Sequence, residues 1–374
     1  MLVRPPGTPA SWSGPLVERE RWEWRAGDPG DPAALLAGFL TEHGLGGPMA
    51  AQRGDTAVAL LAGAGGCAHL GGLPAGLPSP VPEVPELVAV AYARGDAPAA
   101  PVHRPRLPVG SWTGSWSDAE HAAAVEVVRA AIGRGEVYQA NVVGHRRAAH
   151  RSDPLALARA VASLPGATYR GVLSGAGWAV GCASPEQLVQ VAGDRITTVP
   201  IKGTLPVEPG SRERLLASTK DRAEHVMIVD LERNDLSRVA RTGSVEVERL
   251  YDLTDWSGLW QAASTVAARL REDVSTMQVL SALLPGGSVT GAPKRAACAL
   301  LAGLEPVGRG PSMGALGLLW PGGLDLGLTI RTVAATQDAV HLWAGGGITW
   351  GSDPAVEVHE AHAKAAPVQR VLAS

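Results

Sequence analysis

Four runs near the C-terminal end decide the fold: GALGLLW (residues 314–320), LTIRTVA (328–334), VHLW (340–343) and PAVEVHEAHAK (354–364). The first three are short and apolar, and turn-forming residues separate them, so they predict a set of strands. The fourth predicts a terminal helix that begins at about Pro354. Strands that follow one another directly and then give way to a helix are typical of an α+β protein with large antiparallel sheets.

The segments upstream continue this mixture of strands and helices. Ser117 or Asp118 can cap a helix that runs to about Gly133, with apolar residues such as Val125 and Val128 on one face. Further helices are predicted at 211–231 and 274–284, and further strands at 57–61, 86–90, 177–181 and 187–191. The fold class predicted is therefore α+β, with mostly antiparallel sheets.

The chain divides into two regions by composition. Residues 1–110 are rich in Pro, Gly and Ala and contain short strand-like runs, which predicts a β-rich N-terminal region. Four prolines between Asp96 and Val109 break helices and central strands alike, so this segment is expected to be a connector. Residues 111–374 form the second, larger domain, which carries the candidate site.

Composition favours a globular protein that acts on a small molecule. Hydrophobic residues make up 45% of the chain and charged residues 18%, and the net charge of −3 comes without a dense Lys/Arg block, so neither nucleic acid nor a membrane is expected as a partner. The first six residues lack the apolar core of a secretory signal, so we expect a cytoplasmic protein. The three cysteines, at wide spacings, support neither a disulfide framework nor a zinc site.

Lysine is scarce, which draws attention to the places where it occurs. The chain has four lysines, at 202, 220, 294 and 364, against 29 arginines. Arginine does not lose its proton in a protein, whereas a desolvated lysine can become a neutral nucleophile. The terminal helix places Glu357, Glu360 and Lys364 on one face, and a second helical stretch pairs Asp221 with Glu224. These carboxylates could bind Mg²⁺ together, or each group could be a solvated, ion-paired helix face.

Two glycine-rich stretches are candidate binding turns. PGGSVTGAPK (285–294) and AGGGI (344–348) bring backbone amides close together, which suits carboxylate or phosphate oxygens. The first is not a P-loop, because Lys294 follows Ala-Pro and no Ser or Thr comes after it. Ordinary hairpin and loop turns are the alternative for both.

Seven motifs follow one another in a fixed order: ASPE (183–186), PIKGT (200–204), DRAEHVMIVDLERNDL (221–236), PGGSVTGAPK (285–294), TIRT (329–332), AGGGI (344–348) and the Glu357/Glu360/Lys364 helix. In that order they resemble the chorismate-utilising enzymes, which include anthranilate, aminodeoxychorismate, isochorismate and salicylate synthases. The resemblance covers roughly residues 110–374. It implies two large, mostly antiparallel sheets that form a sandwich with helices outside, and a chorismate-binding catalytic domain at 111–374.

Two positions discriminate among the reactions of this family. In the isochorismate and salicylate synthases that this chain resembles, a lysine base activates water. Gln139 stands at the matching position here, so the resemblance implies that ammonia is the nucleophile. Anthranilate synthases carry alanine where this chain has Lys202. The aminodeoxychorismate synthases carry lysine there, so the resemblance implies that Lys202 is a covalent nucleophile, active once its ammonium has lost a proton.

The resemblance also implies roles for the other residues of the motifs. Glu186 is expected to protonate the departing hydroxyl, and Glu224 and Glu360, with Glu357 and Asp221 as outer carboxylates, to hold Mg²⁺. The residues expected to contact the substrate are Arg331, Lys364, Thr290, Gly346, Gly347 and Gln261. The chain departs from the family pattern at Gln261, where anthranilate synthases have a histidine, and at Leu318 and Val358, where relatives have tyrosines.

The function implied is conversion of chorismate and ammonia to 4-amino-4-deoxychorismate in p-aminobenzoate and folate biosynthesis. Because the sequence contains no glutaminase machinery, a glutamine amidotransferase subunit is the expected partner and ammonia source. Two alternatives stay open: a sibling reaction, as in anthranilate synthase or aminodeoxyisochorismate synthase, and a protein that binds chorismate without turnover.

Overall fold

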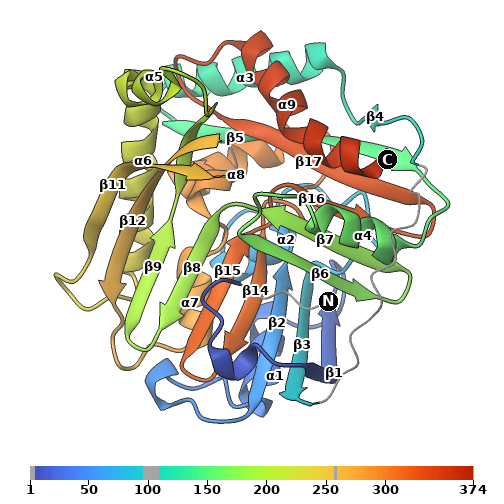
Figure 1. Cartoon of the computed structure of the whole chain (residues 1–374), viewed down its shortest axis with the longest axis vertical. Helices are drawn as coiled ribbons and strands as arrows, with labels where there is room; N and C mark the ends of the chain where they lie inside the picture. The colour runs from blue at the N-terminus through green and yellow to red at the C-terminus, as the bar shows by residue number, and fades with distance from the viewer. Residues whose placement is uncertain (1–4, 96–108, 257–258, 374) are drawn as a thin grey trace.

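The computed structural model describes residues 5–95, 109–256 and 259–373, and it consists of two antiparallel sheets with helices around them (Figure 1). Among the described residues the larger sheet has ten strands. In spatial order they are β1 (Leu16–Trp24), β3 (Leu87–Arg94), β2 (Thr56–Ala62), β14 (Ala315–Trp320), β15 (Gly323–Leu328), β8 (Gln187–Ala192), β9 (Arg195–Val199), β12 (Leu259–Arg269) and β10 (Ile201–Pro206), with β11 (Glu246–Trp256) also paired to β12.

The smaller sheet crosses above one end of the larger sheet in Figure 1. Its strands are, in order, β13 (Gly291–Ala292), β5 (Gln139–Ala149), β17 (Ala339–Ile348), β16 (Thr332–Ala335), β7 (Trp178–Ser184) and β6 (Tyr169–Gly175), with β4 (Thr113–Gly114) paired to β5. The predicted α+β class with two mostly antiparallel sheets is confirmed.

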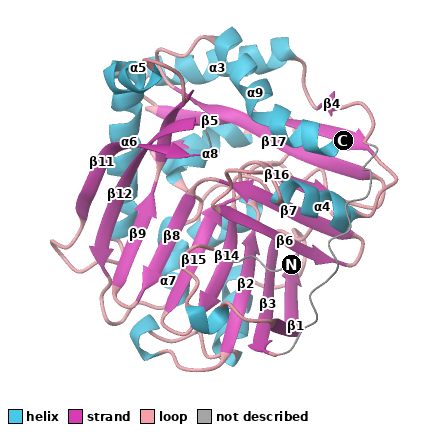
Figure 2. Cartoon of the chain, viewed as in Figure 1, coloured by secondary structure: helices cyan, strands magenta, loops and turns pink. Residues whose placement is uncertain are grey.

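Helices lie on the outside of both sheets (Figure 2). They are α1 (Pro32–Glu42), α2 (Ala64–Gly71), α3 (Asp118–Gly133), α4 (Pro154–Ala162), α5 (Ser211–Ala217), α6 (Thr219–Ser237), α7 (Thr276–Leu283), α8 (Lys294–Ala302) and α9 (Pro354–Leu372), with short 3₁₀ turns η1 (Ala10–Trp12), η2 (Met49–Ala51) and η3 (Gly287–Val289). Helix α9 packs on β17 and against α3, α4 covers β7, and α6 packs on β12. No helix of the described residues is long and apolar enough to cross a bilayer.

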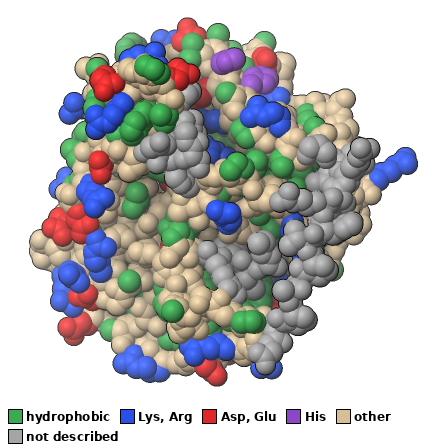
Figure 3. Space-filling view, viewed as in Figure 1, with side chains coloured by type: hydrophobic (Ala, Val, Ile, Leu, Met, Phe, Trp, Pro, Cys, Tyr) green, Lys and Arg blue, Asp and Glu red, His purple; other side chains and the backbone are tan. Residues whose placement is uncertain are grey.

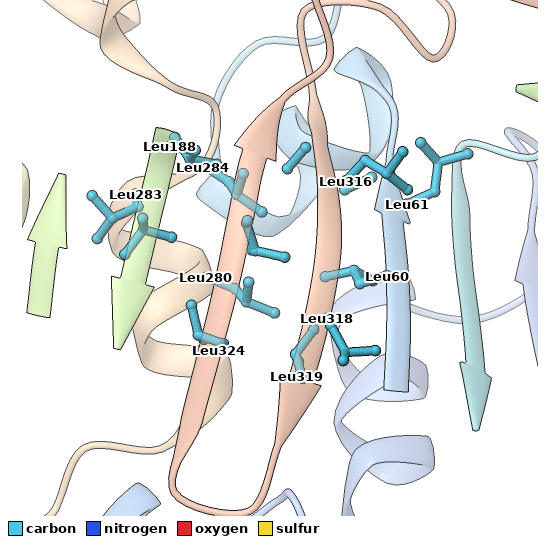
Figure 4. Close-up of a cluster of buried hydrophobic side chains, with 14 of the residues drawn as sticks. Leu60, Leu61, Leu188, Leu280, Leu283, Leu284, Leu316, Leu318, Leu319 and Leu324 are labelled. Atoms are coloured by element: carbon cyan, nitrogen blue, oxygen red, sulfur yellow. The ribbon is translucent and has the colours of Figure 1, made fainter. Parts of the chain in front are cut away.

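The core of the larger sheet is built largely from leucine (Figure 4). Leu60 and Leu61 of β2, Leu318 of β14 and Leu324 of β15 are all fully buried. Strands β14 and β15 are buried along their whole length, which explains why β14 reads as a nearly continuous apolar run. Each buried leucine side chain contributes roughly 1.5–3 kcal/mol, so this cluster fixes the middle of the sheet.

The structure corrects two predictions about the last strands. The predicted strand at 328–334 is confirmed only in its last three residues: β15 ends at Leu328, β16 begins at Thr332, and Arg331 between them has a φ of 50°. The hairpin partner of β14, Gly323–Leu328, was missed because its glycines and Asp325 dilute the apolar pattern. The AGGGI stretch is also not a turn, since residues 344–348 continue β17 and pair with β5.

The N-terminal strands belong to the larger sheet rather than standing apart. Strand β2 pairs with β14 from Ala62↔Ala315 to Val58↔Leu319, which joins β1–β3 to the rest of the chain. The domain boundary at 110 stays a prediction, and the expected connector falls on residues 96–108, outside the described residues. Ion pairs such as Arg195–Glu248 and Arg269–Asp194 join positive and negative charges near the β11–β12 edge. Figure 3 shows Lys/Arg and Asp/Glu side chains interspersed on this side of the molecule.

Candidate active site

The C-terminal end of β17 forms the floor of the candidate site. There Gly345, Gly346 and Gly347 pair with Val143, Val142 and Asn141 of β5. A side chain at Gly347 would collide with Nε2 of Gln139 and lie 3.1 Å from Nζ of Lys202. Glycine is therefore required because two predicted catalytic side chains converge directly over this backbone.

Lys202 extends from β10 and is held by helix α6. Its ammonium donates a hydrogen bond of 3.1 Å to Oε2 of Glu224. The other oxygen of Glu224 accepts a 2.9 Å hydrogen bond from the hydroxyl of Thr349, which follows β17. The Lys202 side chain is 21% exposed, so it is mostly shielded from solvent.

Gln139 begins β5 and is fully buried. Among the described residues neither its amide nitrogen nor its amide oxygen has a hydrogen-bond partner. A buried polar group without a partner costs roughly 1–3 kcal/mol, and such groups are rare in folded proteins. A side-chain amide left in this state beside Lys202 is suited to hydrogen bond a ligand that enters the site.

Glu186 lies between β7 and β8 and is 7% exposed. Ser288, in the glycine-rich turn, donates a 2.8 Å hydrogen bond to its Oε1. Burial raises the pKa of Glu186 to about 7, although the Ser288 hydroxyl, the Ile201 backbone and the charges of Lys202 and Lys364 act in the opposite direction. A carboxyl with this pKa carries a proton near neutrality and can serve as a general acid.

The α9 face predicted from sequence approaches the same glycines. A methyl group at Gly346 would lie 3.1 Å from Oε2 of Glu357 and 3.6 Å from Nζ of Lys364. Lys364 forms a 2.7 Å ion pair with Glu360 and donates a 2.9 Å hydrogen bond to the carbonyl of Gly345. The helix face therefore borders the candidate site, while its Lys364–Glu360 ion pair is about half exposed to solvent.

The remaining predicted residues are distributed around this centre. Arg331 lies in the break between β15 and β16, and burial lowers its pKa while the nearby Glu186 carboxylate raises it. The Thr290 hydroxyl donates to the carbonyl of Gly286, so its proton is used within the turn. Gln261 is buried on β12 opposite Thr204. The side chain of Asp221, on α6, lies outside the described part of the structure.

The carboxylates of the candidate site are oxygen ligands of the type that Mg²⁺ prefers, and substrate and water would complete its coordination shell. Within the described residues no group of three or more His, Cys, Asp or Glu side chains is close enough to hold a metal ion. Mg²⁺ is usually held by one or two carboxylates together with waters and substrate oxygens. Glu357 and Glu360 beside Gly346, with Glu224 beyond Gly347, supply donors of this chemistry.

Sequence reasoning missed a buried cluster behind the glycine-rich turn. Glu232 and Asp235 of α6 are 4% and 3% exposed, and Lys294 of α8 forms a 2.6 Å ion pair with Asp235. The hydroxyl of Thr198 on β9 donates a 3.0 Å hydrogen bond to Glu232. The sequence shows two acids three residues apart on this helix, but that spacing alone does not reveal that they are buried.

Comparison with known proteins identifies the class of molecule to which this site belongs. Residues 81–370 match the family of chorismate binding enzymes, so the chain belongs to that family. Aminodeoxychorismate synthase component 1 of Salmonella typhimurium is 35% identical over 280 residues, which cover 73% of this chain and 61% of that protein. Anthranilate synthase component 1 of Streptomyces coelicolor is 37% identical over 305 residues, which cover 76% of this chain and 59% of that protein.

The fold is also that of a solved relative. Anthranilate synthase component I from Streptococcus pneumoniae superposes with a TM-score of 0.80 at 23% identity, covering 95% of this chain and 92% of that one. The chain spans about three fifths of the length of the two curated relatives. The two curated relatives are named for different reactions but are similarly identical to this chain. Overall similarity therefore does not distinguish the two reactions, and the distinction must rest on the site residues.

Proposed function

We propose that this protein converts chorismate and ammonia to 4-amino-4-deoxychorismate and water, as an aminodeoxychorismate synthase component 1. The observation that carries the proposal is the position of Lys202. Its amine lies over Gly347 beside the Gln139 amide, within the site of a chorismate binding enzyme. An alanine at this position would leave no nucleophile, so the reaction that needs an amine here is favoured over anthranilate formation.

The first half of the reaction uses Lys202 and Glu186. The Lys202 ammonium must first lose a proton, and the Glu224 carboxylate at 3.1 Å is hydrogen-bonded to it. The neutral amine attacks ring carbon 2, the two conjugated ring double bonds each shift by one position toward carbon 4, and the 4-hydroxyl departs as water after taking the proton of Glu186. The raised pKa of Glu186 is what makes that proton available near neutrality.

The second half replaces the lysine with ammonia. Ammonia adds at ring carbon 4, both ring double bonds return to their original positions, and the carbon–nitrogen bond to Lys202 breaks. The proton that the added nitrogen loses restores the acid form of Glu186, so atoms and protons balance. The unpartnered amide of Gln139 is suited to accept a hydrogen bond from ammonia, and unlike lysine it cannot remove a proton from water.

Charged side chains hold the substrate in register. The guanidinium of Arg331 can bind two oxygens of the pyruvyl carboxylate, and Lys364 adds a second positive charge. Glu224 and Glu360, with Glu357 as an outer carboxylate, would hold Mg²⁺, which would supply positive charge opposite the ring carboxylate. We propose that a glutamine amidotransferase subunit supplies the ammonia and that the product enters p-aminobenzoate and folate synthesis.

Turnover with defined substrates tests the proposal. Purified protein is given chorismate, Mg²⁺ and ammonium, with and without an aminodeoxychorismate lyase, and products are separated by chromatography. We expect p-aminobenzoate only when the lyase is present. Direct appearance of fluorescent anthranilate would overturn the proposal in favour of the sibling reaction. Chorismate binding without ammonium-dependent turnover would instead favour a binding protein, an alternative motivated by Gln261 and Leu318.

A further inference from the structure

Two charged side chains complete the outer edge of β5 beyond the end of its short neighbour. Strand β13 pairs with the first two residues of β5. Further along this edge, the carbonyl of Asn141 accepts a hydrogen bond from Arg309, and the amide of Val143 donates a 3.0 Å hydrogen bond to Glu305. Because alternate residues of a strand direct their backbone groups to the same side, this Arg–Glu pair takes the place of further strand residues.

Arg309 also fastens the glycine-rich turn to β5. Its Nη1 donates a 2.7 Å hydrogen bond to the carbonyl of Val289, while its Nη2 reaches the carbonyl of Asn141. Glu305 holds the guanidinium through Nε to Oε2 at 2.8 Å and Nη2 to Oε1 at 2.7 Å. The two side chains are 10% and 8% exposed. Such a two-pronged pair fixes the plane of the guanidinium, and with it the separation of turn and strand.

The two backbone segments that Arg309 joins lead to different parts of the candidate site. Ser288, in the turn, donates a 2.8 Å hydrogen bond to Glu186. Gln139 begins β5, and its amide lies so close to the backbone of Gly347 that an added methyl group there would collide with it. A change in the distance between turn and strand would therefore shift the proposed general acid relative to this amide.

We propose that Arg309, held by Glu305, is a positioning residue that keeps Glu186 and Gln139 in register by clamping the glycine-rich turn to β5. It contacts neither chorismate nor ammonia in the proposed reaction. The inference rests on the proposed roles of Glu186 and Gln139. Small displacements of reacting groups are costly, so loss of the clamp should lower kcat. The KM for chorismate should change little, because the charged groups proposed to bind substrate lie on other elements.

A cavity beside the clamp allows the missing group to be supplied from solution. Arg309 and Glu305 line a cavity of about 150 Å³ together with Thr290 and Cys298. One water needs roughly 10–15 Å³ of such space, so the four heavy atoms of a guanidinium ion can be accommodated. Arg309→Ala enlarges this cavity and leaves the carboxylate of Glu305 in place to bind the ion.

Turnover of Arg309→Ala with and without guanidinium chloride tests the clamp. Chorismate consumption with ammonium and Mg²⁺ gives kcat and KM whichever product forms. We expect kcat to fall roughly tenfold to a hundredfold with KM within about threefold of wild type. Guanidinium at millimolar concentration should restore most of the lost kcat, whereas tetramethylammonium, which carries the charge without an N–H donor, should not. No restoration by guanidinium would overturn the proposal.

Arg53→Ala is the matched control. The Arg53 guanidinium also donates to two backbone carbonyls, those of Ala50 and Gln52, but in the N-terminal region. This variant and the wild type should keep their kcat, with and without guanidinium. A rise in kcat on adding guanidinium to either protein would show that the ion acts elsewhere, which would contradict the proposal.

Hydrogen exchange supplies a readout that needs no turnover and detects a general folding defect. In Arg309→Ala the peptides that cover 139–143 and 287–292 should exchange roughly tenfold faster or more, because hydrogen bonds to a charged group have been lost. Guanidinium should slow both again, while the peptide of β2 should exchange as in wild type. Equal acceleration in all three peptides would show a general loss of stability and contradict the proposal.

Arg309→Lys is the milder second variant. It keeps a positive charge beside Glu305 but offers one nitrogen in place of a planar fork. We expect kcat to fall roughly threefold to tenfold, with faster exchange in the same two peptides. Wild-type values of both would overturn the proposal.

The product separates the two proposals. Anthranilate formation, or no turnover at all, would overturn the proposed function, while local exchange that guanidinium reverses would still support the clamp. Formation of aminodeoxychorismate with neither the local change in exchange nor the rescue would overturn this inference alone.

Discussion

The protonated and the neutral forms of Lys202 have different roles in the candidate site. As an ammonium it is stabilised by Glu224, and as an amine it can attack the substrate. Intact-mass measurement after mixing with chorismate should detect the covalent adduct in the wild type. We expect no adduct in Lys202→Ala, nor in Lys202→Arg, since arginine keeps the charge but does not lose its proton. An adduct of equal yield in either variant would refute the nucleophilic role.

Glu186 should make the fold less stable as the pH rises. Its pKa is about 7, above the ordinary value of 4.5, so the native state binds more protons than the unfolded state between these values. Stability therefore falls through this window. We expect Glu186→Gln to be more stable than wild type at pH 8, by on the order of 2 kcal/mol, and equal to it near pH 4. Urea denaturation at both values measures this; equal stability at pH 8 would contradict it.

Gly347 tests how closely the floor of the site is fitted. Gly347→Ala should displace Gln139 and Lys202 and reduce turnover by roughly tenfold to a hundredfold, because small displacements of reacting groups are costly. Gly351→Ala is the matched control: no atom lies within 4 Å of the added methyl group, and its activity should be unchanged. Steady-state kinetics with ammonium compares the two, and equal activity would show that the close approach does not matter.

At the scale of elements, the start of α9 sets the position of Glu357 and Glu360. Asp353 caps this helix by accepting from the amides of Ala355 and Val356, and Asp153 caps α4 in a similar way. Each aspartate-to-alanine change should cost about 1 kcal/mol of unfolding free energy. Only Asp353→Ala should also raise the KM for chorismate, because α4 carries no site residue. A KM change of equal size in both variants would indicate a general loss of stability.

Helix ends could be predicted from the sequence, whereas the glycine-rich strand end could not. The predicted cap at Ser117 is confirmed by a capping box with Glu120, because caps depend on residues only three apart. AGGGI was interpreted as a turn because three glycines disfavour strands. Its strand form depends on β5, about two hundred residues earlier, and on side chains from α9 and β10 that need room above it.

The site shows the same division. Lys202, Glu186 and Gln139 were named from sequence motifs, and the structure brings them together. The Glu232–Asp235–Lys294 cluster depends on burial that no local pattern reveals. Asp221 and the connector at 96–108 remain predictions, as do the roles of all the site residues, since these depend on ligands.

At the scale of the whole molecule, the N-terminal strands complete the larger sheet. A chain of residues 111–374 alone would leave the edge of β14 unpaired and expose leucines such as Leu316 and Leu318. Exposed apolar sheet edges promote aggregation. We therefore expect this fragment to form aggregates, as measured by size-exclusion chromatography and circular dichroism. A soluble, folded monomer would show instead that the predicted boundary at 110 separates two independent domains.

The pairing of β2 with β14 also has a consequence for biosynthesis. Leu61 of β2 lies opposite Leu316 of β14, so the ribosome must add 255 more residues before β2 can pair with β14. At typical elongation rates of 5–20 residues per second, the apolar strand β2 waits roughly 10–50 s without β14 beside it. During that interval chaperones can bind the exposed apolar strand of the nascent chain. Synonymous codons that slow translation after β3 would lengthen the time for which this strand is exposed.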